Sequence, residues 1–384
     1  MKNTVTLDYK INFIRNSFIR FYAKHKKEIL RAFDKCAKNG DFILREEVSK
    51  FEDNLAKYTG NKYGVGVGSG TDALFLSLKA LGIKEGDEVI TVAHTFIASI
   101  QAIVHCGATP ILIDVGKDEL MDTSLLEGLI TPKTKAIIPV HFHGKVCNMG
   151  VIMQLAKKYN LYVVEDACQA LGSKYRGKMA GSFGDVGCFS FNTPKLLGGY
   201  GDGGGIVTNN RKLCEKLYLL RNHWNMAQTS VRTADFPTPK VVQWAFKSRL
   251  DNIQAAILNV KFKYFNQFLA RRKKIAEMYI KGLGGLPLRL PQYGKEDVIQ
   301  EFIIRIANPK ERIKFKKFMD KKGIELLIRE TTPNHKIKDL GLDHFDLPMT
   351  ENISKDAVRL PCYPEITNQE IAYICKSIKE FYAK

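Results

Sequence analysis

Short apolar runs alternate with amphipathic stretches along the first two-thirds of this chain, and this alternation limits its fold more than any other feature. The apolar runs read as strands at 63–67, 88–92, 109–115, 135–141, 161–165, 186–191 and 205–208. Helical patterns cover 71–81, 95–105, 149–159 and 211–221. Such alternation predicts an α/β fold with a mostly parallel sheet flanked by helices on both faces. Ligands of such sheets bind beyond the carboxyl ends of the strands.

The rest of the chain has a different pattern. A long helical pattern covers 250–279, followed by a strand at 300–306 and helices at 311–322 and 368–382. A chain of 384 residues is long enough for two domains. We predict a large α/β domain at 1–250, including N-terminal helices, and a long connecting helix with a small α+β domain at 251–384. The polar segment 222–240 is predicted to be a long loop, and ordered loops of that length are usually functional.

The chain carries a formal net charge of +19, which suits an anionic partner. Its densest basic clusters, 24–27, 271–274 and 314–317, alternate with apolar residues at helical spacing. They are therefore predicted to be solvated helix faces, and we expect no nucleic-acid partner because no matching motif accompanies them. Since the sequence shows neither a bilayer-spanning apolar stretch nor a signal segment, we expect no membrane association and a cytoplasmic location.

Eight cysteines are scattered along the chain without a C-x-x-C pair. They are predicted to be reduced, mostly buried thiols rather than a zinc site or a disulfide framework. His141 and His143 are close enough in the chain to bind a metal together, but no third ligand appears nearby at a suggestive spacing. We therefore predict no metal site and expect one of the two to be buried and hydrogen-bonded.

Lys195 follows an apolar strand and enters the glycine-rich segment 196–204. Glycine allows backbone and ligand to approach closely. Most lysines in a basic chain lie at the surface, but this one follows a buried strand into a turn where a solvated face is not expected. A lysine that forms a Schiff base needs such a partly desolvated place, because its neutral amine must be available.

Asp166 ends another apolar strand, so its carboxylate is predicted to point into the ligand crevice. Pyridoxal 5′-phosphate (PLP) needs an acid beside its pyridine nitrogen, because the protonated ring is the electron sink. Gln169, one helical turn further on, is placed to hydrogen-bond the ring oxygen. Taken alone, Asp166 is equally well explained as the N-cap residue of a following helix.

Residues 64–74 read as a strand, a turn of small residues and a helix, which is the pattern of a phosphate cradle. The glycines at 64, 66, 68 and 70 do not fit the dinucleotide fingerprint, and the Walker lysine pattern is missing from this turn. Phe96 follows the second strand and is placed either to stack on a pyridine ring or to pack in the core.

Together these segments resemble the DegT/DnrJ/EryC1/StrS family of sugar aminotransferases, a branch of the fold-type I PLP enzymes. The resemblance runs from about Asp41 to the C-terminus. The matching segments are 68–74 (GSGTDAL), 86–90 (GDEVI), 95–96, 134–144 (TKAIIPVHFHG), 164–171 (VEDACQAL), 182–195, 201–204 (GDGG), 248–256 (SRLDNIQAA) and 360–364 (LPCYP).

The resemblance implies chemical roles for four residues. Lys195 would carry PLP as a Schiff base and shuttle the proton. Asp166 would pair with the pyridinium nitrogen, and Gln169 would contact the ring hydroxyl. Phe96 would cover the ring.

The resemblance also implies a phosphate site and a subunit interface. Gly70, Thr71 and Ser190 would hold the cofactor phosphate. Family members are homodimers with shared active sites, so 248–256 and the preceding loop would reach into the site of the partner. Lys247 stands where the family often has an asparagine that contacts the partner's cofactor phosphate.

Departures from the family pattern bear on the substrate. Arg329 and Glu330 stand where many relatives have His-Tyr, and we expect them, with His335, to line the substrate pocket. Leu196 follows the lysine where asparagine is frequent. Some relatives replace the lysine by histidine and dehydrate their substrate, whereas this chain keeps Lys195.

The resemblance therefore implies PLP-dependent transamination of a nucleotide-linked keto-sugar, with L-glutamate or L-glutamine as donor. The Gly-Tyr-Gly-Asp-Gly-Gly segment at 199–204 resembles relatives that act on 3-keto-6-deoxyhexoses. The amino sugar would enter a surface glycan such as the O-antigen of lipopolysaccharide. Alternatives are a 4-keto-sugar or cyclitol aminotransferase, a PLP-dependent sugar dehydratase, and a regulator that binds PLP without turnover.

Overall fold

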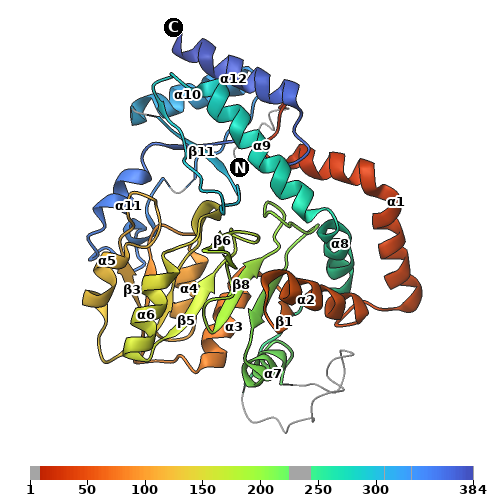
Figure 1. Ribbon diagram of the computed structural model, residues 1–384, viewed down its shortest axis with the longest axis vertical. Helices are drawn as coiled ribbons and strands as arrows, with labels where there is room; N and C mark the ends of the chain where they lie inside the picture. The colour runs from red at the N-terminus through yellow and green to blue at the C-terminus, as the bar shows by residue number, and fades with distance from the viewer. Residues whose placement is uncertain (1–8, 225–243, 307, 330, 384) are drawn as a thin grey trace.

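A seven-stranded sheet forms the centre of the computed structural model, which describes residues 9–224, 244–306, 308–329 and 331–383 (Figure 1). Its strand order is β1-β9-β8-β5-β4-β2-β3. The strands are β1 (Tyr63–Val67), β2 (Glu88–Val92), β3 (Thr109–Ile113), β4 (Thr134–Ile138), β5 (Tyr162–Asp166), β8 (Val186–Ser190) and β9 (Gly204–Thr208). The predicted strands at 109–115, 135–141 and 186–191 end earlier in the structure, because their last residues do not continue the hydrogen bonding with the neighbouring strands.

The sheet is mostly parallel, as predicted, and β9 is the exception. β2, β3, β4, β5 and β8 pair in parallel. β9 runs antiparallel to both β8 and β1. The segment 191–203 between β8 and β9 contains no crossover helix, so the chain returns along the neighbouring strand in the opposite direction.

Helices cover both faces of the sheet, which confirms the predicted α/β class. The helices of this part are α1 (Arg15–Asn39), α2 (Glu46–Thr59), α3 (Gly70–Leu81), α4 (Ala98–His105), α5 (Thr123–Leu126), α6 (Met149–Tyr159), α7 (Arg211–Leu220) and α8 (Asn252–Phe262). Cys188 and Ile206 share a core cluster with α3, α4 and α7. Phe189 and Val207, their strand neighbours, join a cluster with α2 and α8. Successive strand residues thus point to opposite faces.

The C-terminal part has its own core around a three-stranded antiparallel sheet. Its elements are α9 (Phe265–Leu283), β10 (Leu288–Arg289), β11 (Phe302–Ile306), α10 (Pro309–Lys321), α11 (Pro348–Ile353), β12 (Ala357–Leu360) and α12 (Asn368–Tyr382). The predicted single helix at 250–279 is two helices, which break at residues 263–264. α8 packs on α1 and α2, whereas α9 packs on α12 (Figure 1). A short hairpin of β6 (Lys174–Tyr175) and β7 (Lys178–Met179) was not predicted.

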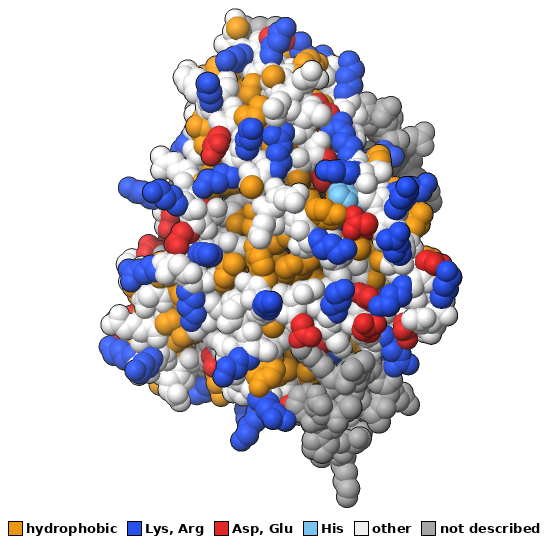
Figure 2. All heavy atoms as spheres, turned by 45° about the vertical axis from the view of Figure 1, so that its right-hand side comes forward, with side chains coloured by type: hydrophobic (Ala, Val, Ile, Leu, Met, Phe, Trp, Pro, Cys, Tyr) orange, Lys and Arg blue, Asp and Glu red, His pale blue; other side chains and the backbone are white. Residues whose placement is uncertain are grey.

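The basic clusters lie on α1, α9 and α10, and Lys and Arg side chains are scattered over the face shown in Figure 2. Arg272 is a correction to the prediction of solvated faces, because its side chain is only 2% exposed. Its guanidinium donates to the backbone carbonyls of Ile299 and Gln300, which the sequence pattern does not reveal. Within the described residues, no helix combines the length and the apolar character needed to cross a bilayer. Most of the predicted loop 222–240 falls outside the described residues.

Candidate active site

A cavity of about 310 Å³ opens at the carboxyl ends of the central strands. Eight of the residues singled out in the sequence line it: Gly70, Thr71, Phe96, Asp166, Gln169, Ser190, Lys195 and Arg329. They come from segments that are far apart in the chain. The parallel strands bring them together, because the carboxyl ends of parallel strands share one edge of the sheet.

The turn between β1 and α3 forms one end of the cavity. Ser69 caps α3, and its hydroxyl accepts a hydrogen bond from the Asp72 backbone N–H at 3.0 Å. A Cβ on Gly70 would lie 2.7 Å from the Ser190 Cβ and 3.0 Å from the Cys168 Sγ, so only glycine fits. The close approach sets the Ser190 hydroxyl beside the first residues of α3. Free N–H groups and the helix dipole make this end suitable for a phosphate.

Asp166 lies at the end of β5 and is 6% exposed. Its carboxylate accepts hydrogen bonds from the Ser99 hydroxyl at 2.7 Å and from the Cys168 backbone N–H at 3.2 Å. The Thr95 hydroxyl lies 2.8 Å from that of Ser99 and helps to fix it. Burial, together with the nearby Asp166 charge, raises the pKa of the Cys168 thiol well above its usual value. Asp166 is therefore held in place beside a neutral thiol, as an anionic partner for a cationic ring nitrogen would be.

Lys195 is partly buried in the turn that follows β8. Its backbone N–H donates to the Asn192 carbonyl at 2.9 Å. Gln300 holds the turn from the C-terminal part, because its amide donates to the Pro194 carbonyl at 3.0 Å and accepts from the Leu196 N–H at 3.1 Å. The position of the lysine is thus set by contacts on both sides of its backbone.

Lys261 of α8 hydrogen-bonds to the glycine-rich segment that follows Lys195. Its ammonium donates to the Gly198 carbonyl and lies 5.1 Å from the ring centroid of Phe18 and 5.9 Å from that of Tyr200. Burial lowers the pKa of Lys261 to about 8. A second amine therefore lies under the lysine-bearing segment without lining the main cavity.

Phe96 and Gln169 lie on the remaining sides. The Phe96 side chain is 61% exposed and lines the cavity instead of packing in the core. The turn before it is held by Asn334, whose amide donates to the Thr95 carbonyl at 2.7 Å. Gln169 accepts a hydrogen bond from the His143 backbone N–H at 3.1 Å. An exposed aromatic face and an amide thus face a ligand bound between Asp166 and Lys195.

Arg329 and the three other predicted site residues differ in placement. Arg329 lines the cavity, is 48% exposed and lies 4.0 Å from the Glu301 carboxylate. The His335 side chain is fully buried, its Nε2 lies 3.1 Å from Glu351, and the structure does not place it on the cavity. Lys247 is exposed on this chain and does not line the cavity either. Glu330 lies outside the described residues.

Several residues of the site were missed in the sequence. Ser99 could have been found, because it lies one helical turn after Thr95 and so shares its face. Asn192 and Asp202 line the cavity and hydrogen-bond to each other at 2.6 Å across the ends of the lysine-bearing segment. Gln300 gives no such signal, because it is distant in the chain and reaches the turn only through the fold.

Solved structures with known cofactors have the same fold. S. venezuelae DesV, solved in complex with a ketimine intermediate, matches with a TM-score of 0.88 and 32% identity, covering 97% of this chain and 99% of DesV. NtdA from Bacillus subtilis, solved with bound pyridoxamine phosphate (PMP), matches with a TM-score of 0.85 and 30% identity, covering 94% and 82%. The cavity offers the groups that PLP requires: a buried carboxylate, a lysine and a helix N-terminus. Fold and site define a PLP-dependent aminotransferase of fold type I.

The family follows from the sequence comparisons. The model of the DegT/DnrJ/EryC1/StrS aminotransferase family matches residues 23–379. The UDP-N-acetyl-3-dehydro-α-D-glucosamine 3-aminotransferase of Acidithiobacillus ferrooxidans is 38% identical over 93% of this chain and 95% of the relative. A pleiotropic regulatory protein of Geobacillus stearothermophilus is 37% identical over 94% and 96%. This chain belongs to the DegT/DnrJ/EryC1/StrS aminotransferase family.

Proposed function

We propose that this enzyme transfers an amino group from L-glutamate or L-glutamine to the keto carbon of a nucleotide-linked sugar. The observation that carries the proposal is the joint presence of Lys195, Asp166 and the N-terminus of α3 in one cavity. Each supplies a different requirement of PLP chemistry, namely an amine, an acid and an anion site. Their arrangement leaves room for a substrate between Lys195 and Arg329.

The residues around the cofactor position would bind and orient the cofactor before proton transfer begins. Asp166 would keep a proton on the ring nitrogen, since its carboxylate is buried and fixed by Ser99. Gly70, Thr71 and Ser190 would bind the phosphate, while the exposed Phe96 ring would cover one face. When bound, PLP supplies the electron sink that stabilises negative charge on the substrate carbon.

Lys195 would carry the cofactor and, once freed by the amino donor, move a proton as base and then as acid. A positioned general acid–base group of this kind contributes about 10²–10⁴-fold to the rate. The hydrogen bonds from Gln300 to Pro194 and Leu196 would keep the amine at one position during both transfers. Phe96 and Gln169, which also line the cavity, would help to exclude water from it.

The substrate class is supported by the relatives and by the charge of the cavity. The relative from Acidithiobacillus ferrooxidans is a 3-aminotransferase of a UDP-linked sugar. Arg329 adds a cation to the cavity wall, which suits a diphosphate or carboxylate. We propose a 3-keto-6-deoxyhexose as acceptor and an amino sugar for a surface glycan, such as the O-antigen of lipopolysaccharide, as the product's destination. A 4-keto acceptor is the main competing substrate.

We also propose that the enzyme is a homodimer with shared active sites, in the cytoplasm. Lys247 supports this proposal, because it is exposed on this chain and lies directly before the buried Ser248, which holds the Gly68 N–H at 3.0 Å. A partner subunit could therefore receive the Lys247 ammonium near its own β1–α3 turn. Light scattering, and activity restored by mixing Lys195→Ala with Lys247→Ala subunits, would test the arrangement.

The central test follows the visible band of the bound cofactor. L-Glutamate or L-glutamine should bleach the band, and the correct nucleotide-linked keto-sugar should restore it with formation of an amino sugar. Acceptors with the keto group at C3 and at C4 should be compared on the same nucleotide. The relative described as a regulatory protein makes a second function worth testing. A protein that binds PLP but never bleaches with either donor would be a regulator, and the transaminase proposal would fail.

A further inference from the structure

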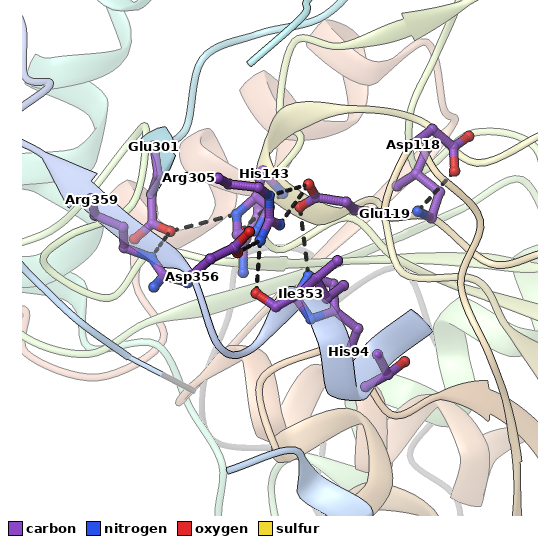
Figure 3. Close-up of polar contacts among 12 residues, drawn as sticks. His94, Asp118, Glu119, His143, Glu301, Arg305, Ile353, Asp356 and Arg359 are labelled. Atoms are coloured by element: carbon purple, nitrogen blue, oxygen red, sulfur yellow. Dashed lines mark hydrogen bonds and ion pairs between the residues drawn. The ribbon is translucent and has the colours of Figure 1, made fainter. Parts of the chain in front are cut away.

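Three possible metal ligands converge beside the active-site cavity. His94 follows β2, Glu119 lies in the loop after β3, and His143 lies in the single helical turn 142–144 after β4. One ligand atom from each residue lies within 4.8 Å of the other two. Figure 3 shows the Glu119 carboxylate facing His94 and Arg305, with His143 beside them.

Two of these atoms are buried without a hydrogen-bond partner among the described residues, namely the His94 Nε2 and the His143 Nδ1. Each imidazole is 8% exposed. The nearest carboxylate oxygens are at 3.8 Å for His94, from Glu119, and at 3.5 Å for His143, from Glu301. A buried polar atom without a partner destabilises the fold. Two buried nitrogens without a hydrogen-bond partner, on residues that cluster with Glu119, indicate a missing ligand.

The backbone at this place is also unusual. Glu119 has φ 70 and His143 has φ 57, both in the left-handed region that side chains with a Cβ avoid. Such conformations are unfavourable and tend to occur at functional sites. Both residues hold this unfavourable backbone conformation in the cluster with His94.

Arg305 fixes the orientation of the Glu119 carboxylate. Arg305 Nε donates to Glu119 Oε1 at 2.9 Å, and the same guanidinium also binds Asp356, so Oε2 remains turned toward His94.

We propose that His94, Glu119 and His143 bind a divalent transition metal, with Zn²⁺ as the best match to two imidazoles and one carboxylate. In a tetrahedral zinc site the ligand atoms lie roughly 3.3 Å apart, so these three must move together by about an ångström. The fourth position would hold water, as in sites with three protein ligands.

The metal would stiffen the wall of the active site rather than take part in transamination. His94 precedes Thr95 and Phe96 in the chain, and the His143 backbone N–H holds Gln169. A shared metal would thus tie two cavity-lining segments together. His141, in contrast, is no candidate ligand, because its ring nitrogens are engaged by Glu165 at 3.0 Å and by the Cys147 N–H at 3.3 Å.

The sequence-based expectation of no metal site relied on spacing around His141 and His143. Glu119 and His94 are too distant in the chain for that criterion to find them. The proposal therefore replaces the pair considered in the sequence by a different pair of histidines and a carboxylate.

The test uses the purified PLP-loaded enzyme after dialysis against a chelator. Zn²⁺ should bind stoichiometrically by elemental analysis and raise Tm, and Co²⁺ should give the ligand-field absorption of a four-coordinate nitrogen and oxygen site. In His94→Gln/His143→Asn the affinity should fall by at least about 100-fold. His105→Asn, which changes an exposed histidine of α4, is the matched control and should bind like the natural protein.

A second variant and two controls distinguish this site from other modes of metal binding. Glu119→Gln is a second variant in case the double variant fails to fold, and it should lose Zn²⁺ binding while keeping the cofactor band. Binding through the cysteines would give intense sulfur-to-Co²⁺ charge-transfer bands, and binding to the cofactor would vanish in PLP-free protein. Either result would overturn the proposal, as would unchanged affinity in both variants or binding only at millimolar Zn²⁺.

Discussion

The two walls of the active-site cavity are built in different ways. The cofactor wall comes from the ends of β1, β5 and β8, and Asp166 on it is fixed by two hydrogen bonds. A second wall is formed by Arg329, which also lines an adjoining small cavity together with Glu301 and Arg359. Arg359 Nε donates to Glu301 at 2.6 Å (Figure 3). Arg329, in contrast, is half exposed and lies 4.0 Å from the same carboxylate.

This difference indicates which wall holds the cofactor and which wall selects the substrate. Groups at strand ends share the rigidity of the sheet, which suits a cofactor that must stay fixed through both halves of the reaction. The Arg329 side chain is half exposed and lies 4.0 Å from the Glu301 carboxylate, so it has room to reorient toward a ligand. We therefore assign the chemistry to the first wall and substrate selection to the second.

The largest expected effect lies on the cofactor wall. Lys195→Ala should lower turnover by roughly 10⁴-fold, because both the covalent link and the proton carrier are removed. Borohydride treatment followed by mass spectrometry should find no cofactor attached to this chain. Lys212→Ala, at an exposed lysine of α7, should leave turnover and attachment intact. Near-normal turnover in Lys195→Ala would remove the basis of the assignment.

Asp166→Asn should reduce turnover by about 10²–10³-fold, since it removes one preorganised charge of the cofactor wall without changing its shape. The absorption spectrum and its pH dependence should change, because the ring nitrogen loses its anionic partner. Asp202→Asn makes the same chemical change at an exposed residue lining the cavity and should have a much smaller effect. Equal losses in the two variants would mean that Asp166 has no special role.

On the second wall, Arg329→Met should weaken the binding of an anionic substrate by roughly 10- to 100-fold, which is the contribution of one charged hydrogen bond. The loss should appear in KM with little change in kcat, because binding rather than proton transfer is affected. Arg329→Lys should recover part of the affinity. If kcat falls while KM is unchanged, the two walls do not divide the tasks as we infer.

The smallest effect is on the stability of the fold and concerns Lys261, which contacts the segment after Lys195. Because burial lowers its pKa from 10.5 to about 8, the folded protein binds this proton less tightly than the unfolded chain does. The folded protein should therefore gain stability as pH rises from about 8 to 10.5, by roughly 3 kcal/mol at most. Urea unfolding of the natural protein and of Lys261→Met at both ends of this range measures the gain. A difference between the two proteins that does not vary with pH would contradict it.

Much of the cofactor wall could be predicted from the sequence because each part depends on a local pattern. A strand followed by a small-residue turn and a helix predicts the β1–α3 cradle, and an acid after an apolar run predicts Asp166. The fold class, the family and PLP are confirmed. The residue roles stay predictions that the variants above address.

The parts that could not be predicted depend on contacts between distant segments. Periodicity does not reveal that β9 runs antiparallel, since strand direction depends on what the chain does between β8 and β9. The burial of Arg272 and the meeting of His94 with Glu119 likewise depend on tertiary packing. The fold places the His335 side chain in the interior, which its position in the chain does not reveal, and its contact with the substrate stays a prediction.

The double hydrogen bond from Gln300 to the turn around Lys195 has a mechanical consequence. Gln300 is the chain neighbour of Glu301, so the arginine–glutamate pair and the turn that carries Lys195 are joined through adjacent residues just before β11. A ligand that displaced Glu301 would therefore also disturb the contact that holds Lys195 in place.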